Sequence, residues 1–206
     1  MSKNKLPVYM KPEDWAKAYE EGTPHWAESQ EPSVFAPQLL EMLGKESGNK
    51  ILEIGAGDGR DSIFFAKKSN EVTGIDIAPG AIEMAKKNAQ SAGMLDKITF
   101  QVGDAERLQF GDSSFDGVFS ISVLHATDLN LSLKEIARVL RHGGKAIIYL
   151  YEKTNEDGQE YWFMKREDVE DLLHKNSFSI EDKWDFMHAG HQGEKTTVLM
   201  FKLTRN

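Results

Sequence analysis

The chain has 206 residues, of which 40% are hydrophobic, so it has the length of one ordinary domain and enough apolar material for a buried core. Its formal net charge is -8, which leaves no basic surface to follow a phosphate backbone, so a nucleic-acid partner is not expected. Because no stretch is long and apolar enough to cross a bilayer and cysteine is absent, we expect no membrane partner, a cytoplasmic location, and no disulfide, thiolate zinc site or cysteine nucleophile.

Two helices are expected at the start of the chain. The first spans Glu13 to Glu21 and places Trp15 and Tyr19 four residues apart, on one face. The second spans Ala36 to Leu43, with its leucines directed inward.

From residue 50 the pattern alternates between short apolar runs and helical periodicity. The expected helices include Ala81 to Ala92 and Leu131 to Arg141, and the glycine pair after His142 is expected to end the second one. Alternation of this kind is typical of a parallel sheet with helices on both faces, which makes the chain a doubly wound α/β protein. The runs expected as strands are 50–54, 71–75, 98–102, 115–121 and 145–151.

The pattern changes after residue 151. A further helix is indicated around Val169, Leu172 and Leu173, and two strands follow at 178–186 and 196–203. A glycine-containing turn, HAGHQG, joins these strands, so the sheet should end in an antiparallel hairpin. We therefore predict one domain over 1–206, made of an N-terminal helical cap (1–49), a core (50–152) and a C-terminal helix with a hairpin (153–206).

The stretch ILEIGAGDGRDS, residues 51–62, begins as a buried strand and then carries glycines at positions 55, 57 and 59. Ligands of open parallel sheets lie beyond the carboxyl ends of the strands, and a glycine loop followed by a helix suits a nucleotide-like ligand. The dinucleotide pattern G-x-G-x-x-G fails because Arg60 takes the place of its last glycine, and no Gly-Lys-Ser or Gly-Lys-Thr of a phosphate-binding loop follows.

The pattern E-x-G-x-G-x-G, from Glu53 to Gly59, resembles the first motif of the class I S-adenosylmethionine-dependent methyltransferases, and the resemblance continues to about residue 150. The resemblance implies a seven-stranded methyltransferase fold whose glycine loop holds the methionine part of the cofactor. It also implies an acidic residue at the end of the second strand that accepts from both ribose hydroxyls. Asp76, in VTGIDIAPGAI, matches this residue and lies 17 residues after Gly59, close to the offset of about 20 usual for a ribose-binding acid.

The same resemblance places further residues against the cofactor. Ile77 would lie on the adenine face, Asp104 in VGDAERL would accept from the adenine amino group, and Ser120 in SISVLHA would lie near the methionine end. A local role for Asp104 as a helix cap is the alternative. The predicted cofactor-binding residues are Glu53, Gly55, Ala56, Gly57, Gly59, Asp76, Ile77, Asp104, Ala105 and Ser120.

His125 is the candidate catalytic base, because it follows the fourth strand near the expected methyl group, although a histidine there could equally be a packed pocket wall. The resemblance suggests that the N-terminal segment covers the cofactor, so Tyr19 and Trp26, together with Tyr161, are expected to line the substrate pocket. Tyr19 could instead only anchor a surface helix. No metal site is expected.

The predicted activity is transfer of a methyl group from S-adenosylmethionine to a small-molecule acceptor by in-line displacement, with S-adenosylhomocysteine as product. Residues 57–85 look most like the branch of tellurite-resistance and thiopurine-type methyltransferases, which act on small soft nucleophiles, although Ala56 stands where those enzymes commonly have cysteine. Two alternatives stay open: a catalytically inactive methyltransferase fold serving as a partner subunit, and an NAD-dependent enzyme, which Arg60 disfavours.

Overall fold

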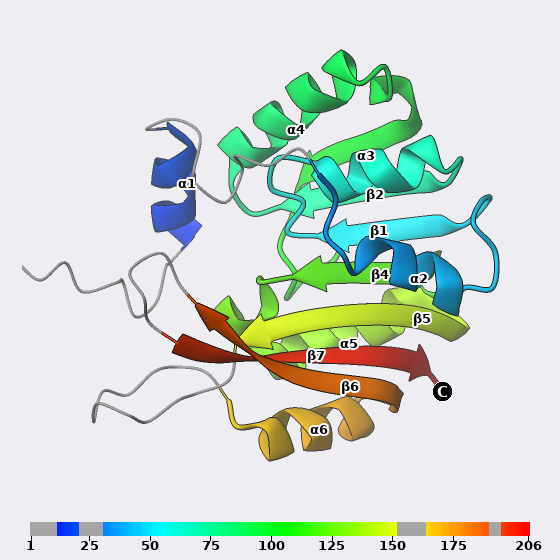
Figure 1. Ribbon diagram of the computed structural model, residues 1–206, viewed down its shortest axis with the longest axis vertical. Coiled ribbons are helices and arrows are strands. Elements are labelled where there is room, and N and C mark those ends of the chain that lie inside the picture. The colour runs from blue at the N-terminus through cyan, green and yellow to red at the C-terminus, as the bar shows by residue number, and fades with distance from the viewer. Residues whose placement is uncertain (1–11, 21–30, 152–163, 190–194) are drawn as a thin grey trace, which may run out of the picture.

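The computed structural model describes residues 12–20, 31–151, 164–189 and 195–206, and its centre is a seven-stranded sheet (Figure 1). The strand order is β3-β2-β1-β4-β5-β7-β6, and β7 runs antiparallel to both of its neighbours while the other pairs are parallel. The strands are β1 (Lys50–Ile54), β2 (Glu71–Asp76), β3 (Ile98–Val102), β4 (Phe115–Ile121), β5 (Leu140–Tyr151), β6 (Phe178–Ala189) and β7 (Lys195–Arg205). The predicted doubly wound fold with a C-terminal antiparallel hairpin is therefore confirmed.

The helices form a layer on each face of the sheet. In Figure 1, α2, α3 and α4 lie on one face, and α5 and α6 lie on the other. The helices are α1 (Pro12–Glu20), α2 (Ala36–Met42), α3 (Arg60–Lys67), α4 (Pro79–Ser91), α5 (Leu129–Val139) and α6 (Arg166–Lys175), with short 3-10 turns η2 (Leu95–Lys97) and η3 (Leu124–Ala126).

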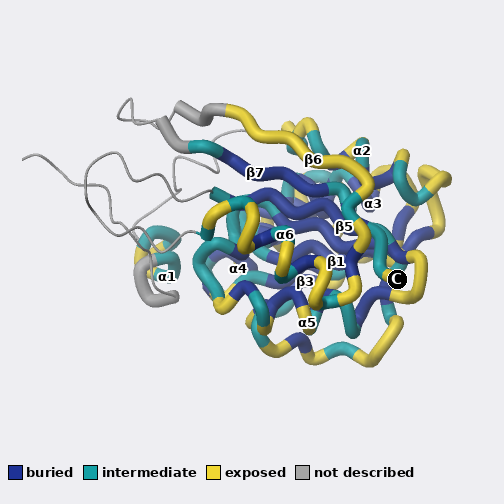
Figure 2. Tube along the Cα trace, turned by 90° about the horizontal axis from the view of Figure 1, so that it is seen from below, coloured by how far each residue is buried: buried dark blue, intermediate teal, exposed yellow. Residues whose placement is uncertain are grey.

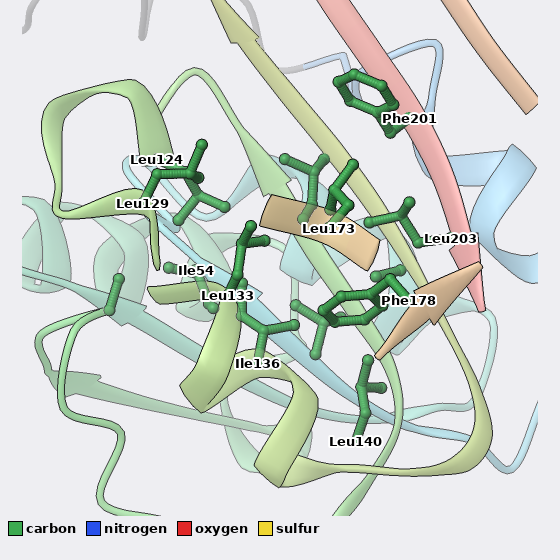
Figure 3. Close-up of a cluster of buried hydrophobic side chains, with 14 of the residues drawn as sticks. Ile54, Leu124, Leu129, Leu133, Ile136, Leu140, Leu173, Phe178, Phe201 and Leu203 are labelled. Carbon is green, nitrogen blue, oxygen red and sulfur yellow. The ribbon is translucent and has the colours of Figure 1, made fainter. Parts of the chain in front are cut away.

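Two buried apolar clusters hold these layers together, one on each side of the sheet. Successive residues of β1 serve opposite faces: Ile51 belongs to the cluster under α2, α3 and α4, whereas Leu52 belongs to the cluster under α5 and α6. Figure 3 shows the second cluster, in which Leu133 and Ile136 of α5 meet Leu173 of α6. Burial of strands on both faces explains why the strand sequences are continuously apolar rather than alternating.

The outer strand β6 differs from the strands inside the sheet. Figure 2 shows β5 and β7 as buried, whereas β6 is largely exposed along the edge. Charged side chains of β6 form ion pairs with α6, Lys183 with Glu170 at 2.7 Å and Asp185 with Arg166 at 2.8 Å. Charges on an edge strand disfavour pairing with a second sheet.

The end of α5 corrects one prediction. The helix was expected to run to Arg141 and to stop at the following glycines, but it ends at Val139, and Leu140 already pairs with Phe115 as the first residue of β5. The pairing is then interrupted and resumes at Lys145. Leu140 is fully buried, and an apolar residue is expected there both in the last turn of a helix and at the start of a strand. Apolar periodicity therefore could not distinguish the two.

The predicted hairpin turn is also shorter than expected. His188 and Ala189 extend β6 and pair with Thr196 and Lys195 of β7, so the turn residues HAGHQG are partly strand. Residues 190–194, between the two strands, lie outside the described residues.

Candidate functional site

The glycine loop lies at the carboxyl end of β1, between β2 and β4, where the strand order reverses. Its three glycines have φ values of 76°, 54° and 81°, a left-handed conformation that other residues adopt only with strain. The N–H groups of Gly55 and Ala56 both donate to the carbonyl of Ile75 at 2.8 Å, which holds the loop against β2. The loop is thus a fixed turn that opens into α3 at Gly59.

Side chains from three other elements pack onto this loop. A Cβ atom added to Gly55 would lie 2.0 Å from Cγ2 of Val123, and one added to Gly57 would lie 3.2 Å from the hydroxyl oxygen of Tyr19. Gly59 is equally confined, because its Cβ would lie 2.9 Å from the Cβ of Ala85 on α4. The contact of Val123 was missed by sequence reasoning, which had no signal that this side chain would reach the first glycine of the motif.

Ser122 directs Val123 onto the loop. Its φ is 58°, which is uncommon for a residue with a side chain, and its N–H donates to the carbonyl of Tyr149 at 3.0 Å. The turn after β4 is therefore held in an unfavourable backbone conformation by β5, and strain of this kind is concentrated at functional sites.

Asp76 joins the end of β2 to the glycine loop. Its Oδ2 accepts from the N–H of Gly57 at 3.0 Å, and its Oδ1 accepts from the N–H of Ala78 at 2.9 Å. Burial raises the pKa of Asp76, and these backbone hydrogen bonds oppose the shift. Each carboxylate oxygen has a second lone pair, so both can still accept a hydrogen bond from a vicinal diol.

The residues expected around adenine lie at the ends of β2 and β3. Ile77 is 39% exposed and Val102 is 52% exposed, and Val102 pairs with Asp76 in the sheet. Both are exposed aliphatic side chains at the ends of neighbouring strands, and Val102 was not singled out from the sequence. Asp104 is exposed and its Oδ1 accepts from the N–H of Glu106 at 2.9 Å, while Ala105 is buried. Asp104 thus already stabilises its own turn.

Three buried carboxyl groups surround the start of α3. Glu53 accepts from the hydroxyl of Ser62, and burial together with the neighbouring Asp61 raises its pKa well above the ordinary value. Burial raises the pKa of Asp61 to about 6, and its Oδ1 accepts from the N–H of Ser33 at 2.6 Å. Burial also raises the pKa of Asp58. Asp61 is buried and links α3 to the segment before α2.

Ser120 is fully buried, and its hydroxyl donates to the carbonyl of Ile54 at 3.2 Å. The hydroxyl therefore ties β4 to β1 at the reversal of strand order.

His125 lies in η3, two residues after Val123, and its ring packs edge-on against Tyr151 with centroids 4.7 Å apart. Burial lowers its pKa to about 4, so the imidazole is neutral at pH 7 and is a weaker base than an exposed histidine. Beside it is a cavity of about 320 Å³ between η3, the start of α5, β5 and α6.

Of the three residues predicted to line the substrate pocket, the structure describes only Tyr19. Tyr19 lies over both the glycine loop and α4, since a Cβ on Gly80 would lie 2.8 Å from the Cβ of Tyr19. Trp26 and Tyr161 lie outside the described residues.

Two classes of site were searched for within the described ranges. No cluster of three or more acidic or histidine side chains there could hold a metal ion. No helix in the same ranges is both long and apolar enough to span a bilayer.

Comparisons with known proteins agree on the central segment. Residues 52–148 match the family model described as a methyltransferase domain. The chain is 35% identical over 113 residues to the methyltransferase GfsG of Streptomyces halstedii. The aligned segment covers 54% of this chain and 41% of that protein. The chain is 34% identical over 128 residues to the sterol 4-C-methyltransferase strm-1 of Caenorhabditis elegans, covering 60% of the chain and 38% of that protein. The chain thus spans less than half the length of these curated relatives.

Similarity in fold to solved structures extends beyond residues 52–148. The crystal structure of the cyclase SpnF superposes with a TM-score of 0.75 at 15% identity, covering 96% of this chain and 97% of that one. At this identity the similarity establishes the arrangement of the elements and not the chemistry.

Proposed function

We infer that the chain is a class I S-adenosylmethionine-dependent methyltransferase, as the match of residues 52–148 to the methyltransferase domain and the seven-stranded sheet support. One observation carries the inference furthest: Asp76 bridges the end of β2 and the glycine loop at the point where the strand order reverses. A ligand seated there meets the carboxylate of Asp76, which is hydrogen-bonded directly to the glycine loop.

The side chains present fit this cofactor. Asp76 has two oxygens with free lone pairs for the ribose hydroxyls, and the exposed Ile77 suits one face of the adenine. Gly55 and Gly57 let the backbone approach the methionine part closely. Asp61, with a pKa of about 6, is ionised at pH 7, and its negative charge at this end of the sheet complements a cofactor with a positive sulfur and a positive amino group.

When bound, the cofactor supplies a methyl group on a positively charged sulfur, which leaves as a neutral thioether. The protein then has to align the acceptor with the carbon–sulfur bond and exclude water, and such positioning is worth roughly 7–11 kcal/mol. Tyr19 and Val123 are placed to shield the site, since both already pack on the glycine loop. His125 is the proposed acceptor of the proton that a neutral acceptor molecule loses, because its ring lines the adjoining cavity, and the low pKa that burial gives it makes it a weak base.

The acceptor is a small molecule. The acidic charge of the chain disfavours nucleic acid, and the curated relatives include a protein named as a sterol methyltransferase. The branch that includes tellurite-resistance and thiopurine-type enzymes remains a prediction from the sequence of the cofactor-binding segment, as does a cytoplasmic location.

The test is calorimetric titration of the protein with S-adenosylmethionine, S-adenosylhomocysteine and NAD in parallel. Micromolar binding of the first two without NAD is the expected result. Binding of none would favour an inactive partner subunit, and binding of NAD alone would overturn the argument from Arg60. Asp76→Ala should abolish the binding of S-adenosylhomocysteine, whereas Asp96→Ala, in the η2 turn after the C-terminal end of α4, should leave it unchanged.

A further inference from the structure

The cavity beside His125 is large enough for a small organic ligand. At about 320 Å³ it falls at the lower end of the range for small-molecule sites, roughly 300–1,000 Å³. It lies at the carboxyl edge of the sheet, on the face covered by α5 and α6, and Figure 3 labels two of its aliphatic walls, Leu124 and Leu129. The lining residues are Leu124, His125, Thr127, Asp128, Leu129, Asn130, Leu150, Met164 and Leu172.

The chain connects this cavity directly to the glycine loop. Val123 packs on Gly55, and the next two residues, Leu124 and His125, form the wall of the cavity. His125 and the aliphatic side chains therefore line one cavity, and Val123, the residue before Leu124 in the chain, contacts the glycine loop.

The charges of the lining argue against an anion. Among the described lining residues there is no lysine or arginine, and the one formal charge is the carboxylate of Asp128. That carboxylate is fixed at the rim, because it accepts from the N–H of Leu131 at 3.0 Å as the cap of α5. Among the lining residues that the structure describes, an anionic ligand would find no cationic partner to compensate for its lost hydration. Five of the nine described lining residues are leucine or methionine, so uncharged apolar surface is favoured instead.

We propose that this cavity is the acceptor pocket and that it selects a small, uncharged, largely apolar molecule with a hydroxyl group, rather than a soft anion. The proposal rests on the proposed function and narrows it. In the reaction the hydroxyl oxygen forms the bond to the methyl carbon, the carbon–sulfur bond breaks with its electron pair on sulfur, and the hydroxyl proton passes to the imidazole of His125. Of the soft nucleophiles expected from the resemblance to tellurite-resistance enzymes, the anionic ones do not match the charges of the described lining.

The test measures binding of matched neutral and anionic probes by calorimetry: n-octanol against octanoate, and para-ethylphenol against para-ethylbenzoate. Each is titrated into the protein alone and into the protein loaded with S-adenosylhomocysteine. We expect at least one neutral probe to bind, with its anionic counterpart about tenfold weaker or more. Absence of binding by both neutral probes, or equal binding within either pair that binds, would overturn the proposal.

Two variants localise the probe. Leu172 of α6 lines the cavity and is only partly buried, so Leu172→Trp fills the space from a position that tolerates a larger side chain. It should weaken the neutral probe about tenfold or more. Leu131 of α5 is 43% exposed and does not line the cavity, so Leu131→Trp is the matched control and should leave binding unchanged.

Equal weakening by both variants, or by neither, would place the probe elsewhere and refute the assignment. Binding of S-adenosylhomocysteine should be the same in both variants and in the parent protein. Failure of S-adenosylhomocysteine to bind the parent protein would count against the proposed function, while the titrations without it would still test the pocket.

Discussion

The contact of Val123 with the first glycine of the loop makes Gly55 a sensitive position for stability. In Gly55→Ala the new methyl group meets two penalties. Alanine must adopt a φ of 76°, which costs roughly 1–2 kcal/mol, and its Cβ would lie 2.0 Å from Cγ2 of Val123, which forces a rearrangement worth roughly 1–3 kcal/mol. We expect a loss of roughly 2–5 kcal/mol in the free energy of unfolding.

Gly93 provides the matched control. Its φ is 67°, nearly that of Gly55, but a Cβ there would meet nothing within 4 Å. Gly93→Ala should therefore cost only the backbone part, roughly 1–2 kcal/mol. Urea denaturation of the unliganded protein, followed by circular dichroism, measures both values.

A double mutant separates the contact from the backbone strain. Val123→Ala in the Gly55→Ala background removes the methyl groups that clash and should recover about 1 kcal/mol or more, whereas Val123→Ala alone should destabilise. Equal losses in Gly55→Ala and Gly93→Ala, with no recovery in the double mutant, would refute the reasoning from the packing of Val123.

Three further predictions concern charged and titrating groups. Asp76→Asn keeps the size of the side chain but loses one acceptor oxygen, so the affinity for S-adenosylhomocysteine should fall at least about tenfold by calorimetry, and the exposed Asp104→Asn should have a smaller effect. Burial raises the pKa of Asp61 to about 6, so the stability that this group contributes is complete below its unfolded pKa of 3.8 and is lost as pH rises through 6. Asp61→Asn should therefore gain stability relative to the parent protein as pH rises from 4 to 7, by up to about 3 kcal/mol in urea denaturation. A difference in free energy of unfolding between the two proteins that stays constant over this pH range would contradict the raised pKa. For His125 the sign is opposite: burial lowers the pKa from 6.5 to about 4, so its contribution is complete above pH 6.5 and is lost as pH falls through 4. His125→Phe, which can keep the ring contact with Tyr151, should not show this loss of stability at low pH, which amounts to up to about 3 kcal/mol in the parent protein. Titration of the His125 imidazole near pH 6.5, followed by NMR, would refute the lowered pKa.

The sequence by itself determined which segments form buried strands and where the ligand-binding loop lies. Continuous apolar runs predict strands buried on both faces, and 50–54, 98–102 and 115–121 coincide with β1, β3 and β4. The glycine spacing after β1 and the acid that ends β2 could be identified from the sequence because both lie at strand ends, and parallel strands bring their carboxyl ends to one edge of the sheet. The proximity of Asp76 to Gly57 follows from that geometry.

Helix limits were less predictable where burial was equal on both sides of the boundary. Leu140 is buried whether it closes α5 or opens β5, and only its pairing with Phe115 decides between them. Local periodicity contains no information about which strand a residue will pair with.

Only the tertiary structure decided what surrounds the motif. It packs Val123 on Gly55, buries Asp61 against Ser33, turns the hydroxyl of Ser120 into the sheet, and leaves a cavity between η3 and α6 beside His125. Each of these depends on segments far apart in the chain, and on the direction of single side chains that spacing does not specify. The type of ligand site therefore follows from the order of residues along the strands, whereas the burial, pKa and enclosure that set its selectivity arise from packing between elements.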